Sequence, residues 1–186
     1  MAITQRLTLA EFLALPEEDP ALELEPDGVV VQKVSPKGRH SRLQLVLCER
    51  INQYAEPRRL ALAFPELRVT FGGAAYVPDV SVYAWDRIPR TTDGEIADVF
   101  EQPPDVAIEI VSPQQSPNAV LRRCVWYVEN GVAFALLVDP ADRSILRFEQ
   151  EHAARVLRAG DGIDFGAVLH GFRLTVDEVF GALRLP

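Results

Sequence analysis

The chain has 186 residues, of which 48% are hydrophobic and 25% charged, a composition typical of a folded globular protein. This length is enough for one full hydrophobic core, so we expect a single domain over residues 1–186. The formal net charge of −8 excludes a broad basic surface for coating nucleic acid, because phosphate binding depends on neutralisation by Lys and Arg. It does not exclude a divalent metal ion held between carboxylates. Cys48 and Cys124 lack metal-ligand spacing, which excludes a disulfide framework and a zinc site.

Membrane insertion and secretion are not expected. The longest stretch without Asp, Glu, Lys or Arg runs from Ile110 to Leu121 and contains two prolines, whereas a membrane span needs about 20 apolar residues. Near the N-terminus, Glu11 interrupts the chain before an apolar run of signal-peptide length. We therefore expect a cytoplasmic protein.

The N-terminal third predicts a helix, a hairpin and a second helix. Thr8 and Glu11 have the spacing of a capping box, which predicts a short helix ending near Leu15. Strand-like runs at 21–25 and 28–34 flank the turn residues Pro26 and Asp27 and predict a hairpin. From Arg39 to about Tyr54, apolar residues recur every three or four positions and predict an amphipathic helix.

The remaining sequence predicts mainly strands. Runs of β-forming residues predict strands at 60–71, 76–84, 105–111, 132–138 and 144–148, with weaker candidates at 156–157 and 163–169. Gly72 and Gly73 suit a tight turn, and residues 85–104 read as a loop. Helices are predicted at 118–129 and 175–183. The fold class is α/β or α+β around one mixed sheet, with the order helix, strand, strand, strand, helix, strand over a core of about residues 39–138.

Two acids lie inside these apolar strands. Asp79 stands in the run Val-Pro-Asp-Val, and Glu109 stands in a strand that is apolar on both faces. A lone buried carboxylate costs several kcal/mol unless a cation or hydrogen bonds compensate it. Acids from neighbouring strands can share one hard cation such as Mg²⁺, which prefers oxygen ligands. Alternatively, each acid ends its strand facing solvent or pairs with an arginine.

Several segments in a fixed order resemble one protein family. The segments are Glu23-Leu-Glu-Pro-Asp-Gly28, Ser35-Pro36, Pro78-Asp79-Val80, Pro104 to Pro113, Tyr127 with Gly131-Val132, and Leu137-Val-Asp-Pro140. Together they resemble the Uma-type family of restriction endonucleases, formerly a domain of unknown function, in the PD-(D/E)XK nuclease superfamily. The resemblance covers roughly residues 8–180. It implies a restriction-endonuclease-like core with the element order given above, preceded by a helix and hairpin and followed by strands and a helix.

The resemblance also assigns candidate site residues. It implies that Asp79 and Glu109 are catalytic acids that bind Mg²⁺, or Mn²⁺, with the carbonyl of Ile110 as a third metal ligand. Glu23 matches an acid of the family's first hairpin and is expected to reach the same cleft. The ion would polarise the scissile phosphate and lower the pKa of the attacking water.

The chain departs from the family pattern at two positions. Val111 stands where the superfamily has its lysine, and Ala119 stands where the family tends to have an acid. In the family, the following helix usually supplies the basic residue, and the corresponding position here is Arg123, with Arg122 beside it. Arginine can bind a phosphate bidentately, but it stays protonated and cannot accept a proton. Arg123 is therefore expected to act electrostatically, with an exposed arginine as the competing interpretation.

Other polar and aromatic residues have simpler interpretations. His40, near the start of a helix, reads more readily as a cap or surface residue than as a substrate contact. The segment Ser112–Ser116 could bind phosphate or simply be a polar loop. Packing explains three aromatic residues better than base stacking does, and Cys124 reads as a small buried hydrophobe. These aromatic residues are Trp85, Trp126 and Tyr127.

The sequence therefore predicts a Mg²⁺-dependent endonuclease that hydrolyses DNA phosphodiester bonds. The alternative is a degenerate nuclease fold that serves as a nucleic-acid-binding or regulatory module, an interpretation favoured by the missing lysine and by Ala119. Cutting both strands of a duplex calls for two active sites, so a homodimer is the default expectation.

Overall fold

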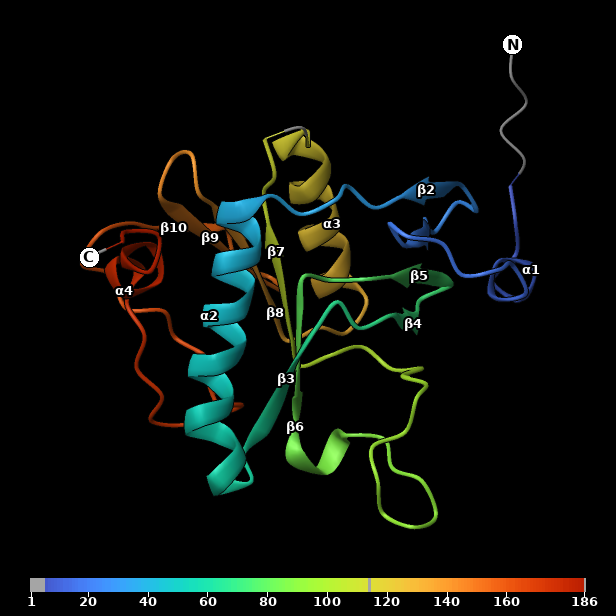
Figure 1. Ribbon diagram of the computed structural model, residues 1–186, viewed down its shortest axis with the longest axis horizontal. Helices are drawn as coiled ribbons and strands as arrows, with labels where there is room; N and C mark the ends of the chain where they lie inside the picture. Colours follow the sequence, from blue (N-terminus) through green and yellow to red (C-terminus); the bar gives the residue numbers. More distant parts are fainter. Residues whose placement is uncertain (1–5, 114, 186) are drawn as a thin grey trace.

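A six-stranded sheet forms the centre of the protein in the computed structural model, which describes residues 6–113 and 115–185 (Figure 1). The strand order is β10-β9-β8-β7-β6-β3. The strands are β3 (Ala61–Pro65), β6 (Val80–Ala84), β7 (Val106–Ile110), β8 (Phe134–Asp139), β9 (Ser144–Glu149) and β10 (Arg155–Leu157). Only β7 and β8 pair in parallel among these, and they are joined through a helix, as a parallel connection requires. The predicted mixed sheet is confirmed.

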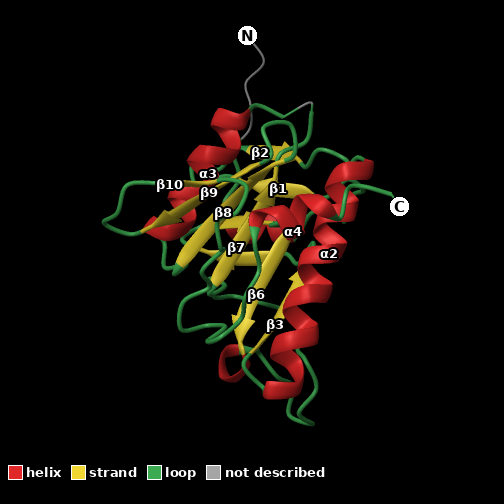
Figure 2. Cartoon of the chain, turned by 90° about the vertical axis from the view of Figure 1, so that its left-hand side faces the viewer, coloured by secondary structure: helices red, strands yellow, loops and turns green. Residues whose placement is uncertain are grey.

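Two long helices cover opposite faces of this sheet (Figure 2). On one face, α2 (Gly38–Ala55) packs its residues Leu43, Leu47 and Ile51 against alternate strand residues such as Ile108. On the other face, α3 (Pro117–Glu129) packs Val120, Cys124, Tyr127 and Val128. Because strand side chains alternate between faces, the nearly all-apolar β7 is buried on both sides. The order α2, β3, β6, β7, α3, β8 agrees with the predicted core order.

A second sheet, absent from the sequence prediction, lies beside the first. Its order is β2-β1-β5-β4, and all its neighbouring strands are antiparallel. The strands are β1 (Leu22–Leu24), β2 (Val30–Gln32), β4 (Val69–Phe71) and β5 (Ala74–Tyr76). The N-terminal hairpin is therefore confirmed, and β5 joins it to the rest of the fold.

The prediction of continuous strands at 60–71 and 76–84 was wrong, because each run is divided between the two sheets. The first run breaks after Pro65, where Glu66 takes a left-handed backbone conformation with φ of 50°. The second run breaks at Val77-Pro78-Asp79, where proline cannot donate a ladder hydrogen bond. The second break places Asp79 at the junction of the sheets.

The ends of the chain contain short elements. Capping boxes begin both α1 (Leu9–Leu13) and α4 (Val176–Gly181), as their Thr-x-x-Glu patterns predict. Short 3₁₀ turns lie at η1 (Glu56–Arg58) and η2 (Trp85–Arg87), the latter within the predicted loop. The weak strand candidate at 163–169 was wrong, since this segment is irregular chain followed by turns, and its apolar residues, such as Phe165, pack into the α2 side of the core. Across the described residues, none of the helices combines the length and apolarity required to cross a membrane.

Candidate active site

Two buried acids lie opposite each other where β6 begins and β7 ends. Asp79 directly precedes β6, and Glu109 is the penultimate residue of β7. Val80 pairs with Ile108 in the antiparallel ladder, and one further step of this register places Asp79 opposite Glu109. The exposed fraction of each residue is 2%. Residues directly opposite in an antiparallel pair lie on the same face, so the structure brings these two predicted residues together.

Lys33 supplies a cation to this acidic pair. Lys33 directly follows β2. Its backbone N–H donates a 2.8 Å hydrogen bond to the carbonyl of Ala21, which holds this part of the chain in place. Its Nζ lies 2.8 Å from Asp79 Oδ1 and donates a 2.7 Å hydrogen bond to the carbonyl of Val77. Burial alone would lower the pKa of Lys33, but the charges of Asp79 and Glu109 raise it above its ordinary value. Lys33 is therefore a buried, protonated ammonium that contacts Asp79 directly and is further stabilised by the charge of Glu109.

Asp79 is held in its ionised form by its neighbours. Its Oδ2 accepts a 2.7 Å hydrogen bond from the backbone N–H of Ile110, and His40 Nε2 lies 3.2 Å from Oδ1. Burial is the largest influence on the pKa of Asp79 and would raise it. The contacts with His40 and Lys33 outweigh burial and lower this pKa below its ordinary value.

Glu109 has a different environment. Its Oε1 accepts a 2.7 Å hydrogen bond from the hydroxyl of Tyr127 and lies 3.7 Å from Arg123 Nη1. Burial raises the pKa of Glu109 to about 7, against the opposing charge of Arg123. The two acids therefore differ, because Asp79 is fully ionised at neutral pH while Glu109 titrates near it.

Arg123 reaches the site from α3. Its side chain lies close to that of Tyr127 because residues four apart share one face of a helix. The guanidinium is held by Glu23 of β1, with Nη2 to Oε2 at 2.7 Å and Nη1 to Oε1 at 3.1 Å, and its Cζ lies 4.6 Å from the ring centroid of Tyr76. Arg122 is exposed instead. Of the two neighbouring arginines, Arg123 is thus the one that faces the acids.

Glu23 anchors this arrangement from the second sheet. It is 1% exposed, and its Oε1 also accepts a 2.9 Å hydrogen bond from the backbone N–H of Val77. The acid therefore reaches the cleft as expected, but its contacts are with Arg123 and the backbone, not with Asp79. Its position depends on the contact between β1 and β5.

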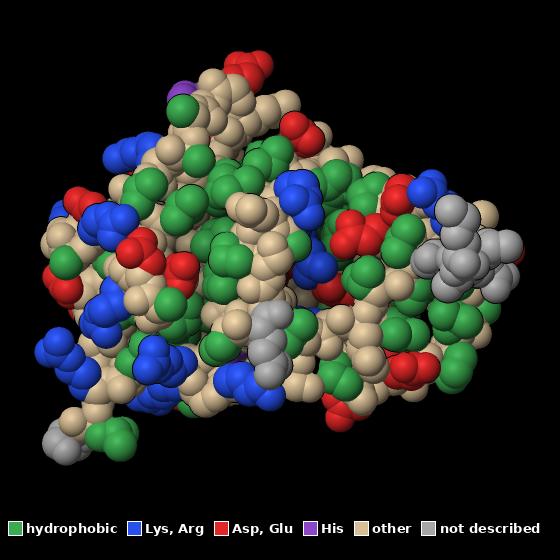
Figure 3. Space-filling model, turned by 90° about the horizontal axis from the view of Figure 1, so that it is seen from above, with side chains coloured by type: hydrophobic (Ala, Val, Ile, Leu, Met, Phe, Trp, Pro, Cys, Tyr) green, Lys and Arg blue, Asp and Glu red, His purple; other side chains and the backbone are tan. Residues whose placement is uncertain are grey.

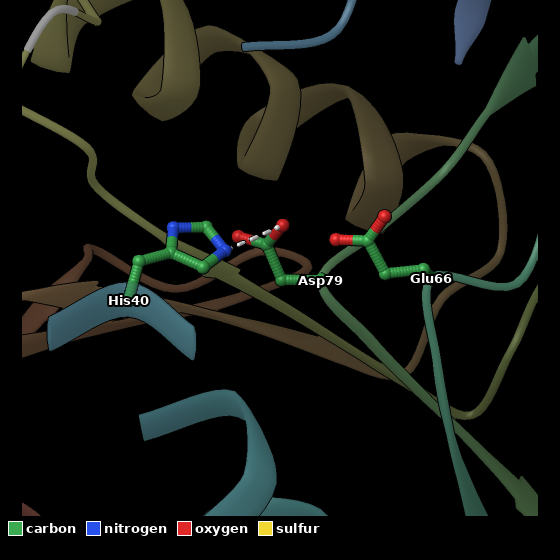
Figure 4. A group of neighbouring side chains, drawn as sticks. All are labelled: His40, Glu66 and Asp79. Carbon is green, nitrogen blue, oxygen red and sulfur yellow. Dashed lines mark ion pairs between the residues drawn. The ribbon is translucent and has the colours of Figure 1, made fainter. Parts of the chain in front are cut away.

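A second group of ligand-type side chains surrounds Asp79 (Figure 4). The group consists of His40 on α2, Glu66 after β3, and Asp79. One ligand atom from each residue lies within 4.8 Å of the other two. His40 Nδ1 lies 3.0 Å from the hydroxyl oxygen of Ser112, and Gln44 on α2 donates a 2.8 Å hydrogen bond to the carbonyl of Asp79. Glu109 and Ile110 do not belong to this group.

The site fits a divalent cation. Within the site, the three buried acids Glu23, Asp79 and Glu109 outnumber the buried Lys33 and the largely buried Arg123, whose side chain is 16% exposed. His40 Nε2 and Asp79 Oδ1 are buried and lack a partner with hydrogen-bond geometry, even though Lys33 is close to Oδ1. Lys33 offsets the charge of Asp79, and a cation bound between Asp79 Oδ1 and His40 Nε2 would give both atoms a bonded partner.

A cavity adjoins this edge of the sheet. It has a volume of about 400 Å³ and is lined by the start of α2, including Lys37 and Arg39, and by segments that follow β7 and β8. Figure 3 looks onto this side of the molecule and shows Lys and Arg side chains next to Asp and Glu at a hollow in the middle of the face. His40, which contacts Asp79, and Val111 and Ser112, which follow the strand of Glu109, lie in the wall of this cavity.

The remaining candidates have mostly structural environments. Trp126 packs edge-on against Tyr76, and Trp85 packs at the margin of the α3 core. Cys124 is fully buried, and burial raises the pKa of its thiol well above the ordinary value. In the segment 112–116, Ser112 is buried against His40, and residue 114 lies outside the described residues.

The sequence interpretation missed Lys33, Glu66 and the role of Tyr127. Lys33 could have been noticed as one of only two lysines, placed directly after a predicted strand. Tyr127 follows Arg123 by four residues, so helical spacing places it beside the same acid. No local pattern distinguishes Glu66 from other loop acids.

Comparison with known proteins defines the class. The fold matches a crystal structure described as a "putative nuclease belonging to DUF820" from Anabaena variabilis ATCC 29413, with a TM-score of 0.92, 36% sequence identity, and coverage of 96% of this chain and 99% of that chain. The chain thus shares the fold of that protein. Residues 9–177 match the model of the Uma2 family, described as "Putative restriction endonuclease", and the chain belongs to this family. A search of curated proteins found no match.

Proposed function

We propose that this protein is a divalent-metal-dependent endonuclease that hydrolyses phosphodiester bonds in DNA. The observation that carries the proposal is the buried pair Asp79 and Glu109, which lie opposite each other at the ends of adjacent strands, with Lys33 in contact with Asp79. Membership of a family of restriction endonucleases supports this chemistry. The cavity lined by His40, Val111 and Ser112 supports the approach of a phosphate backbone to this end of the sheet.

The two acids are the proposed ligands of the ion, together with the carbonyl of Ile110. Mg²⁺ is the expected ion and Mn²⁺ the alternative, because carboxylate and carbonyl oxygens suit both. A bound ion would polarise the scissile phosphate and lower the pKa of the attacking water. Ionised Asp79 contributes a permanent negative charge, and Glu109 contributes a second one when it loses its proton.

The two buried bases stabilise negative charge in this proposal. Arg123 has two N–H donors suited to a phosphate, and Glu23 fixes the orientation of its guanidinium. The raised pKa of Lys33 keeps its ammonium protonated, so Lys33 offsets charge and does not accept a proton. Both bases act through positive charge that is already in place before the reaction begins.

A second candidate function is nucleic-acid binding without cleavage. It is favoured by Val111, which leaves the strand of Glu109 without a lysine, and by the engagement of Arg123 with Glu23. Under this alternative, DNA would bind without being cut in the presence of any divalent ion.

We expect the protein to cleave closed circular DNA in the presence of Mg²⁺ or Mn²⁺. Cleavage should stop when EDTA removes the ion. Circular DNA has no ends, so its cleavage distinguishes an endonuclease from an exonuclease. The measurement is gel electrophoresis of circular single-stranded DNA and of plasmid DNA over time. Sedimentation of the protein separately tests the expected homodimer. Cleavage that persists in EDTA would contradict the metal requirement, and retarded but uncut DNA would favour the binding function.

Replacement of Arg123 with alanine should lower the rate of cleavage by about 10²–10³-fold, as loss of a positioned donor to a developing oxyanion does. Arg122→Ala is the matched control on the same helix, and this exposed residue should leave the rate unchanged. Because Arg123→Ala leaves Glu23 buried without its partner, the double variant Arg123→Ala/Glu23→Gln tests whether instability explains the loss. A rate restored in the double variant, or an equal loss in Arg122→Ala, would contradict the proposed role of Arg123.

A further inference from the structure

Two side chains from separate parts of the chain, His40 and Glu66, converge on the carboxylate of Asp79. His40 extends from the first turn of α2, and Glu66 extends from the break after β3. The two point toward Asp79 from opposite sides in Figure 4. Their ligand atoms and an oxygen of Asp79 all lie within 4.8 Å of one another.

The closest two of these atoms lack hydrogen-bond partners. His40 Nε2 and Asp79 Oδ1 lie 3.2 Å apart, and each is buried without a hydrogen bond of acceptable geometry. The residues are 3% and 2% exposed, so these atoms are withdrawn from bulk solvent. When His40 Nδ1 donates to Ser112, Nε2 presents a lone pair to the carboxylate. Two facing acceptors require a cation between them or a proton on the imidazole.

The spacing suits a metal ion. Adjacent ligands of an octahedral ion with bonds of about 2.1 Å lie about 3 Å apart, close to the 3.2 Å between His40 Nε2 and Asp79 Oδ1. The side chain of Glu66 is 40% exposed and can move the short distance needed to bring its carboxylate onto the same ion.

We propose that His40 Nε2, Asp79 Oδ1 and the Glu66 carboxylate bind a divalent cation, with Mn²⁺ preferred over Mg²⁺. The inference rests on the proposed nuclease function for the reaction that the ion serves, but binding itself follows from these three side chains. It adds a nitrogen ligand at Asp79 to the oxygen ligands proposed above, and it thereby makes Mn²⁺, in place of Mg²⁺, the preferred ion.

The imidazole is the reason for the preference. Mg²⁺ is a hard cation that takes oxygen ligands and keeps several waters, whereas imidazole nitrogen suits first-row transition metals. Two carboxylates beside one imidazole give the mixed oxygen and nitrogen set that Mn²⁺ accepts.

Lys33 is the cation that competes for this position. Its Nζ lies 2.8 Å from Asp79 Oδ1 and 3.5 Å from Glu66 Oε1. Its hydrogen bond to the carbonyl of Val77 gives the ammonium a partner when an ion binds to Oδ1. Metal binding therefore exchanges one contact of Lys33 without leaving its charge unpartnered.

The test uses Mn²⁺ and the full chain. Electron spin-echo envelope modulation of bound Mn²⁺ should show coupling to a ¹⁴N nucleus of an imidazole, and calorimetry should give tighter binding for Mn²⁺ than for Mg²⁺ by about 10-fold or more. The chain has three histidines, so His40→Gln should remove the nitrogen signal while His170→Gln, an exposed control, retains it.

Variants separate the ligands from the fold. His40→Gln and Glu66→Gln should each weaken Mn²⁺ binding by at least about 10-fold. Replacement of residues that only support metal ligands already lowers metal affinity by about 10- to 100-fold. His40→Gln should also reduce the preference for Mn²⁺ over Mg²⁺. Glu66 is half-exposed, so circular dichroism should confirm that its variant keeps the native fold.

Failure of this inference can be distinguished from failure of the proposed function. Bound Mn²⁺ without a ¹⁴N signal, or affinity unchanged in both His40→Gln and Glu66→Gln, would overturn the inference even when DNA is cleaved. Nitrogen-coupled Mn²⁺ together with uncut DNA would uphold the site and reject the nuclease function. Absence of Mn²⁺ binding to the wild-type chain would overturn the inference outright.

Discussion

Asp79→Asn and Glu109→Gln should each reduce DNA cleavage by about 10³-fold or more. Each change removes one negative charge from the proposed metal site with little change in side-chain shape. A bound ion contributes several kcal/mol of charge stabilisation to such reactions, and each 1.36 kcal/mol corresponds to about tenfold in rate. The measurement is the initial rate of plasmid cleavage at saturating Mg²⁺ or Mn²⁺.

Glu129→Gln is the matched control for this prediction. Glu129 is an exposed acid at the end of α3, and its variant has the same change of charge and shape as Glu109→Gln. Its cleavage rate should equal that of the wild-type chain. Activity of Glu109→Gln close to that of Glu129→Gln would show that the buried pair is not the site of hydrolysis.

Lys33→Met should lower the free energy of unfolding by about 3–5 kcal/mol, because removing one partner of a buried ion pair leaves an uncompensated buried charge. The side chains of Lys33 and Asp79 are only 5% and 2% exposed. Methionine has a similar length and keeps most of the apolar packing, so the loss reports mainly on charge. Urea unfolding monitored by circular dichroism measures this change.

A double variant tests the cause of this loss. Lys33→Met/Asp79→Asn should be more stable than Lys33→Met, because the uncompensated carboxylate is gone. Lys37→Met, a change at the other lysine, should alter stability by no more than about 0.5 kcal/mol, since Lys37 is exposed. A Lys33→Met variant as stable as Lys37→Met would mean that the pair with Asp79 contributes nothing.

The site residues that could be predicted are those that stand out from their neighbours in the sequence or match the family pattern. Asp79 and Glu109 are conspicuous as acids within apolar strands, and burial makes such acids costly unless something compensates them. Arg123 was identified through the family resemblance, which places the basic residue on the helix after Glu109, and helical geometry explains why Arg122 points elsewhere.

The parts that could not be predicted depend on how the two sheets meet. Lys33 reaches Asp79 only because the chain bends at Glu66 and at Pro78 and joins the N-terminal hairpin to β5. A backbone with positive φ at a glutamate has no marker in the sequence. His40 was interpreted as a cap or surface residue, yet it is 3% exposed, because its burial comes from packing against Ser112 and Asp79.

The most direct test compares the wild-type chain with the double variant Asp79→Asn/Glu109→Gln on supercoiled plasmid DNA. Both proteins are freed of metal, and Mg²⁺ or Mn²⁺ is then added. The wild-type chain should convert the plasmid to nicked or linear DNA only after the ion is added, and the double variant should leave it supercoiled. Equal cleavage by the two proteins, or no cleavage by the wild-type chain with either ion, would contradict a metal-dependent nuclease site at Asp79 and Glu109.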